Sequence, residues 1–230
     1  MKKKIIIIVA IIIVAILAIM GYFIFSDLKQ EENLKTELSE ISDLTNAETI
    51  DTDAINERLD RIITTGDYAV VEDAFKTYLR ENFDNILKIT EILNDERITT
   101  LLTVENYKED GKEFTESKNY IVTTRNELER CKAKYAEFLT EEKAMSYIND
   151  KGLDSYYTDL YKQEFVGDIE SSNDGVVESS IDEIIAILNT SEKILNLLSE
   201  NQNDWEIEGE NIVFSNDNLS NEYDELINSL

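Results

Sequence analysis

Residues 67–93, DYAVVEDAFKTYLRENFDNILKITEIL, decide the fold class of this chain. Apolar residues recur along this stretch at spacings of three and four, the period at which side chains share one face of an α-helix. Asp67 is a suitable N-cap, so the stretch predicts an amphipathic helix about 40 Å long. The apolar stripe consists of Val71, Phe75, Tyr78, Leu79, Ile86, Ile89 and Leu93. Asn82 interrupts the stripe, where it either fixes the register between helices or reaches the rim.

The sequence on both sides of this helix repeats the helical period. Further helices are predicted over residues 34–45, 55–63, 98–107, 116–139, 140–152, 153–165, 176–199 and 219–227. The chain has no proline, so glycines and capping residues must end these helices. Two short segments, 205–207 and 212–214, flank Glu208-Gly209-Glu210-Asn211 and predict a β-hairpin that packs through Trp205. We therefore expect an all-α fold, a helical bundle with a small hairpin near residues 205–214.

The N-terminus predicts a membrane anchor. Lys2, Lys3 and Lys4 precede 21 uncharged residues, Ile5 to Phe25, which suffice to cross a bilayer as a helix. A cleaved signal has a shorter apolar run and small residues at its cleavage site, and a buried helix of a soluble domain rarely lacks polar residues for so long. Both alternatives fit less well than an uncleaved, single-pass signal anchor.

The lysines before the span predict a cytoplasmic N-terminus and an extracytoplasmic C-terminal part at the plasma membrane. We expect three parts: the anchor at 1–25, a juxtamembrane helical stalk at 26–50 and an acidic helical-bundle domain at 51–230. The layout and composition are typical of bacterial cell-envelope proteins.

Charge and composition limit the partners and the chemistry. The chain has a formal charge of −27, and 19 basic residues face 49 acidic ones once the three N-terminal lysines are set aside, a charge of −30. Such a surface repels nucleic acid. The chain has no histidine, which excludes Ser-His-Asp and Cys-His catalysis and histidine-ligated metals. Cys131 is the one cysteine; it either is a buried small hydrophobe or pairs with another chain.

The tyrosines between 147 and 161 are the candidate recognition surface. Tyr147, Tyr156, Tyr157 and Tyr161 supply amphipathic contact area suited to a protein or glycan partner. The alternative is that their rings belong to the bundle core with the hydroxyl groups at its rim.

Acidic residues offer two further hypotheses, both weaker. Pairs such as Glu141-Glu142 suggest a two-carboxylate mechanism, but 49 acidic residues produce such pairs by chance. The loop 170–175 resembles the first half of an EF-hand but has Ile181 at the twelfth position, and 51–53 lacks the glycine; helix caps explain both.

We therefore expect a non-enzymatic, membrane-anchored binding module at the cell envelope, without a cofactor. An extracytoplasmic domain that senses a small molecule or a calcium ion, or assists its transport, is the alternative. A pocket lined by the tyrosines favours the sensor, whereas a solid core with an exposed aromatic patch favours the binding module.

Overall fold

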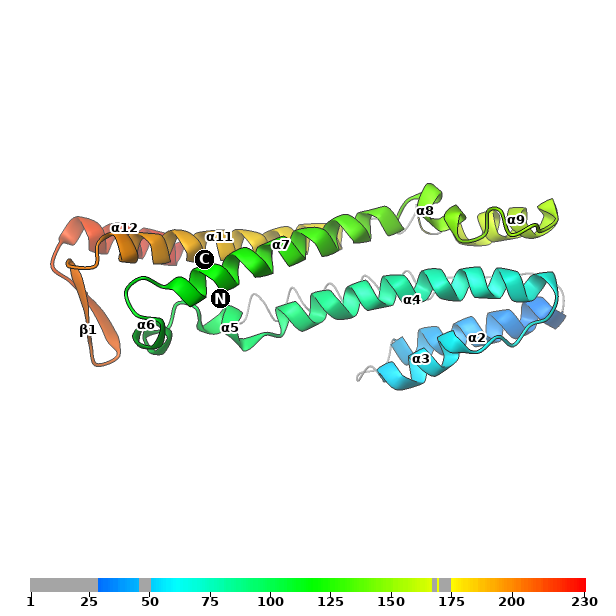
Figure 1. Cartoon of the computed structure of the whole chain (residues 1–230), viewed down its shortest axis with the longest axis horizontal. Helices are drawn as coiled ribbons and strands as arrows, with labels where there is room; N and C mark the ends of the chain where they lie inside the picture. Colours follow the sequence, from blue (N-terminus) through cyan, green and yellow to red (C-terminus); the bar gives the residue numbers. More distant parts are fainter. Residues whose placement is uncertain (1–28, 46–50, 167–168, 170–174) are drawn as a thin grey trace. The chain divides into compact units, whose positions relative to one another are not determined.

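The computed structural model describes residues 29–45, 51–166, 169 and 175–230, and these are mostly helical, as predicted (Figure 1). The elements are α2 (Lys29–Thr45), α3 (Thr52–Asp60), α4 (Asp67–Leu93), α5 (Glu96–Thr100), α6 (Val104–Asp110), α7 (Thr115–Phe138), α8 (Glu141–Ser146), α9 (Ser155–Tyr161), the π-helix η1 (Lys162–Val166), α11 (Val176–Glu200), β1 (Trp205–Glu208), β2 (Asn211–Phe214) and α12 (Asp217–Asn228). Within those ranges, no helix combines the length and apolar content that a membrane span needs. The predicted anchor at 1–25 lies outside them.

The chain divides into two compact units, which we describe separately. Unit 1 comprises Ile89–Arg130 and Ser179–Leu230, and unit 2 comprises the described residues up to Lys88 together with Cys131–Glu178. The boundaries fall inside α4, α7 and α11.

The core of unit 2 is built on the predicted stripe of α4 from Val71 to Ile86. Tyr78 packs edge-on against Phe138 of α7, with ring centroids 5.5 Å apart, and its hydroxyl donates a hydrogen bond to the Phe138 carbonyl at 2.9 Å. Asn85 donates to the carbonyl of Cys131 at 3.0 Å, and Cys131 is buried, as one of the two alternatives predicted. The helix expected as a stalk is α2, and its apolar residues Leu34, Leu38 and Ile41 are buried within this unit.

Unit 1 contains the predicted hairpin, with Trp205 opposite Phe214 and Glu208 opposite Asn211. The two-residue turn begins with Gly209 at φ +66, a conformation that glycine adopts without strain and that tight hairpin turns require. Trp205 is buried, as predicted: its ring stacks on Phe114 at 6.0 Å between centroids, and its indole N–H donates to the Leu198 carbonyl at 2.7 Å.

Four predicted helices differ from the observed ones. The helix over 140–152 ends at Ser146, and the helix over 153–165 begins at Ser155 and continues as the π-helix η1 from Lys162. The helix through 55–63 ends at Asp60, because Arg61 is extended at φ −89 and ψ 146, and Ile62 and Ile63 are exposed. The helix over 98–107 is two helices, α5 and α6. The Thr103 hydroxyl accepts a hydrogen bond from the Asn106 amide and so starts a new helix inside the apolar repeat.

Asn82 does not reach the rim. It is buried, and no hydrogen-bond partner for its Oδ1 occurs among the residues that the structure describes.

Candidate functional site

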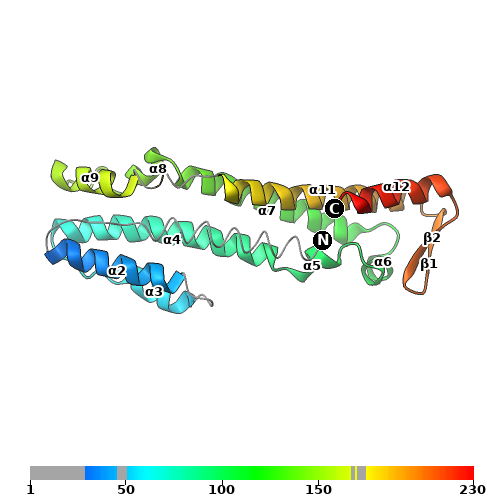
Figure 2. The same cartoon turned by 180° about the vertical axis from the view of Figure 1, so that it is seen from behind.

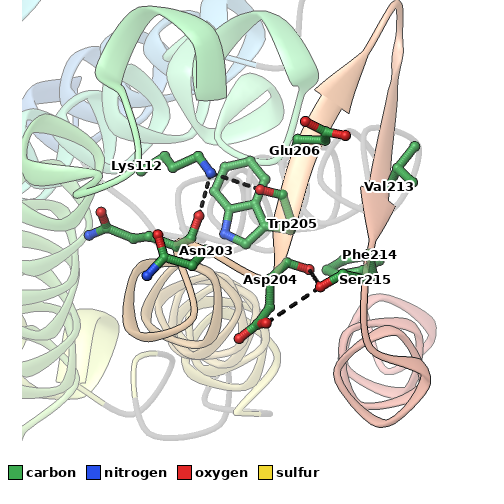
Figure 3. A pocket seen from close by; sticks show the side chains of 9 residues that line it. Lys112, Asn203, Asp204, Trp205, Glu206, Val213, Phe214 and Ser215 are labelled. Atoms are coloured by element: carbon green, nitrogen blue, oxygen red, sulfur yellow. Dashed lines mark hydrogen bonds between the residues drawn. The ribbon is translucent and has the colours of Figure 1, made fainter.

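The hairpin cleft is a cavity of about 480 Å³ at the base of the hairpin in unit 1 (Figure 3). It is lined by Lys112, Gln202, Asn203, Asp204, Trp205, Glu206, Val213, Phe214 and Ser215. Three segments therefore build it: the loop between α6 and α7, the turn after α11, and both strands. We call this cavity the hairpin cleft throughout.

Local backbone geometry fixes the α6–α7 wall of the cleft. Gly111 ends α6 at φ +74 and Phe114 has φ 54, a conformation uncommon outside glycine. Asp110 then caps α7, since its carboxylate accepts hydrogen bonds from the amides of Glu116 at 3.0 Å and Ser117 at 2.8 Å. These turns bring the buried Phe114 ring onto Trp205 and place Lys112 beside the hairpin.

Lys112 holds the strand to this wall. Its ammonium donates to the carbonyl oxygens of Gln202 and, at 2.7 Å, Trp205, and it lies 4.6 Å from the centroid of the Trp205 ring. Figure 3 shows this nitrogen over the indole and directed at the Trp205 carbonyl. A cation over an aromatic face is attracted by the ring quadrupole. Lys112 is thus engaged with the protein, although its charge offsets part of the negative charge of the cleft.

The carboxylates of the cleft keep most of their hydrogen-bonding capacity. The Ser215 hydroxyl lies 3.4 Å from Asp204 Oδ1, and its amide donates to the Asp204 carbonyl at 2.9 Å. No ion pair to Asp204 or Glu206 occurs in the described part of the chain. Residues 200–230 contain nine acidic residues and no lysine, arginine or histidine. The cleft therefore offers acceptors and negative charge, which suits a cationic ligand.

Unit 2 contains a second polar group, in which Glu37, Glu72 and Lys76 are buried, Arg58 is half-buried and Arg61 lies at the exposed edge; we call it the buried ionic cluster after its three buried members. Lys76 is 1% exposed and pairs with Glu72 at 2.7 Å and with Glu37 at 3.2 Å. The same ammonium donates to the carbonyls of Arg58 at 2.8 Å and Arg61 at 2.7 Å. Arg61 in turn binds both oxygens of Glu37, at 2.8 and 2.5 Å. Every charge in the cluster has an opposite charge beside it.

Glu72 fastens the segment after α3 to α4. It is fully buried and accepts hydrogen bonds from the amides of Ile63 and Thr64 and from the Thr64 hydroxyl, at 2.7–3.1 Å. Burial alone raises the pKa of Glu72, but the hydrogen bonds from Lys76, Thr64 and the backbone outweigh burial and lower it. Burial likewise raises the pKa of Glu37, and Arg61 and Lys76 reverse the shift to a lowered value. We interpret this saturated cluster as structural.

The four predicted recognition tyrosines occupy different environments in unit 2. Tyr161 is buried, and its hydroxyl donates to the Ala144 carbonyl at 3.0 Å. Tyr147 is half-buried and donates to Glu81 at 2.7 Å. Burial raises the pKa of both phenols.

The other two tyrosines lie at the surface. Tyr156 is 51% exposed and packs edge-on against the half-buried Tyr157, whose ring also contacts Tyr68 at 5.1 Å. The structure thus brings Tyr68, which sequence reasoning left out of the group, together with Tyr156 and Tyr157. Tyr68 lies three residues before Val71 of the apolar stripe of α4, so the helical period already placed Tyr68 on the core-facing side of this helix.

The described residues lend no support to the calcium site or to the two-carboxylate mechanism. These residues include no group of three or more acidic or cysteine side chains that could hold a metal ion, and the loop 170–174 lies outside them. Asp51 acts as an N-cap and accepts from the Ala54 amide. Four carboxyl groups with shifted pKa values, those of Glu37, Glu72, Asp95 and Asp110, are all shifted downward, the opposite of what a general acid needs at neutral pH.

Sequence reasoning missed the cleft. The hairpin signal, the lysine at 112 and the tail without basic residues were visible separately, but nothing in the spacing joined residue 112 to residues 202–215. Comparisons with protein-family models, curated proteins and solved structures yielded no match to this chain.

Proposed function

We propose that this chain is a non-enzymatic binding protein of the cell envelope, anchored in the plasma membrane by Ile5 to Phe25, which captures a basic segment of an extracytoplasmic protein partner in the hairpin cleft. The observation that carries the proposal is the pair of cleft carboxylates, Asp204 and Glu206, which have no basic partner among the described residues and lie in a tail without basic residues. The anchor and its orientation rest on the sequence of residues 1–32.

The position of the tyrosines supports partner binding over a tyrosine-lined sensor. The buried rings of Tyr78 and Tyr161 fill the core of unit 2, and the hairpin cleft has no tyrosine in its lining. The cleft lining is largely polar, whereas pockets for small molecules are mostly apolar. A polar rim with spare carboxylates suits lysine or arginine side chains of a protein.

A second candidate is a sensor for a small cationic molecule. The cavity volume of about 480 Å³ supports it, because small-molecule pockets measure roughly 300–1,000 Å³. Competition by a small polyamine distinguishes the two candidates. A polyamine fully displaces a small cationic ligand from the cleft. An extended peptide also contacts the rim, so its displacement needs a higher polyamine concentration.

The test uses the full chain in phosphatidylcholine nanodiscs and extended octapeptides of charge +4, 0 and −4. We expect the +4 peptide alone to bind, and the double variant Asp204→Asn/Glu206→Gln to weaken it about tenfold, because two charge-assisted contacts are lost. The matched control, Asp224→Asn/Glu225→Gln, removes the same two charges from exposed positions on α12. Equal weakening by both variants would reduce the effect to diffuse attraction and contradict the cleft.

The orientation is tested separately with intact cells. We expect external protease to remove residues beyond the anchor, since the acidic part is proposed to face outward. A chain that stays intact until the cells are lysed would contradict the orientation.

A further inference from the structure

Unit 2 has an apolar surface that the proposed partner site does not use. Among the described residues, the exposed large apolar side chains of unit 2 are Ile62 (43%), Ile63 (37%) and Tyr156 (51%). Tyr157 and Tyr68 continue the surface inward from Tyr156 through edge-on ring contacts of 5.2 and 5.1 Å. We call these three tyrosines, together with the two isoleucines on the separate segment after α3, the tyrosine–isoleucine surface.

Hydrogen bonds place the segment that carries the two isoleucines alongside the first half of α2. The Gln30 amide donates to the Thr65 hydroxyl at 3.0 Å, and Arg61 binds Glu37, so residues 61–65 run alongside α2 toward its first turn. Figures 1 and 2 both show the starts of α2 and α4 together with α9 at one end of unit 2. Ile62 and Ile63 follow that path, and Tyr156 and Tyr157 lie on α9.

Chain length ties this end of unit 2 to the bilayer. Lys29, the first residue of α2, is four residues beyond Phe25, the last residue of the predicted span. Four residues extend at most about 14 Å. If the span ends at the lipid interface, the start of α2 lies within that distance of the interface. The chain therefore holds this end of unit 2 near the bilayer.

We propose that the tyrosine–isoleucine surface rests in the interfacial region of the bilayer that carries the anchor, a lipid contact that rests on the proposed anchoring. Tyrosine suits this zone because its ring is apolar and its hydroxyl stays wet. Arg61 is paired with Glu37, and Arg80 with Asp60 at 2.6 Å. Exposed acidic residues lie beside the tyrosines in the sequence, at Asp67, Asp154 and Asp159, so the contact depends on apolar area and suits a zwitterionic lipid.

The test measures depth in the membrane with the full chain in phosphatidylcholine nanodiscs. Single cysteines replace Ile62, Tyr156 or, as a control, Asp84, in a Cys131→Ala background, and each carries a neutral fluorophore. Asp84 is exposed on α4, 16 residues or about 24 Å along the helix from Tyr68. Lipids spin-labelled near the top of the acyl chain act as quenchers. We expect at least twofold stronger quenching at positions 62 and 156 than at position 84.

Equal weak quenching at all three positions, in chains that resist alkaline carbonate extraction, would overturn the lipid contact and leave the anchor standing. Extraction of the chain by carbonate would overturn both. Shielding of positions 62 and 156 from aqueous iodide without lipid quenching would assign the surface to a protein, either a partner or a second copy, and would also overturn the proposal.

Discussion

Two lysines in this protein make the same backbone contacts in opposite settings. Lys76 in unit 2 and Lys112 in unit 1 each donate hydrogen bonds to two carbonyl oxygens. Lys76 is buried and lies between the carboxylates of Glu37 and Glu72. Lys112 is exposed, and the cleft carboxylates near it form no ion pair with any residue that the structure describes.

The difference teaches how to separate structural charge from charge available for binding. Desolvation makes a buried charge costly unless opposite charges and hydrogen bonds surround it, so the buried ionic cluster must be saturated. At the cleft, water can solvate Asp204 and Glu206, so they can persist without a partner and exchange water for a ligand. A charged group whose hydrogen bonds and ion pairs are all made within the protein therefore indicates a structural role here. A carboxylate with unused hydrogen-bonding capacity indicates a binding role.

The largest expected effect comes from removing the buried cation. We expect Lys76→Met to lower the free energy of unfolding by about 4 kcal/mol, because Glu37 and Glu72 would then share a buried site with less compensation. Urea unfolding of the full chain in nonionic detergent, followed by circular dichroism, measures the change. Lys151→Met, at an exposed position of unit 2, is the matched control and should change stability by less than about 0.5 kcal/mol.

A loss of under about 1 kcal/mol for Lys76→Met would contradict the difference proposed between Lys76 and Lys112. It would mean that the buried ionic cluster is as tolerant of change as an exposed pair.

A smaller effect, with a pH signature, is expected for Glu72→Gln. The folded-state pKa of Glu72 lies below its ordinary value of 4.5, so the carboxylate contributes its full stabilisation above about pH 4.5 and loses it as the pH falls through the lowered pKa. At pH 6 the variant should be about 2 kcal/mol less stable than the wild-type chain, since a hydrogen-bonded charge is lost. The measurement is urea unfolding of both chains at pH 6 and pH 3.5.

The difference between the two chains should shrink at pH 3.5. Taking the difference cancels the general effect of protonating other acidic residues, which both chains share. A gap that stays constant with pH would mean that the ionised form of Glu72 is not what matters.

The sequence predicted the helices of unit 2 better than their connections. The α4 stripe is buried as expected, because a 27-residue repeat leaves a helix one way to bury its apolar side. Ile62 and Ile63 looked like a continuation of the helix that ends at Asp60. What the period could not reveal is that the amides of Ile63 and Thr64 bond to Glu72, which holds this segment out of the helix.

The candidate sites were less predictable, for the same physical reason. Tyr156 and Tyr161 belong to one aromatic pattern, yet one is exposed and the other buried, since the helical face that reaches the core depends on the neighbouring helices. The hairpin was predicted from its turn and from Trp205. Its cleft was not, because Lys112 reaches Trp205 across 93 residues of chain.

The smallest expected effect is for Lys112→Met, the same substitution as in the buried ionic cluster. We expect a loss of about 1 kcal/mol, because the lysine is exposed and its carbonyl partners can bind water instead. The loss should appear as faster hydrogen exchange at the amides of β1 and β2 in the full chain, measured by mass spectrometry. Because the charge that offsets the cleft carboxylates is removed, the +4 octapeptide should bind several-fold more tightly. Weaker binding would show that the contribution of Lys112 to the structure of the cleft outweighs the effect of its charge on the peptide. Lys112 would then have a structural role, like Lys76.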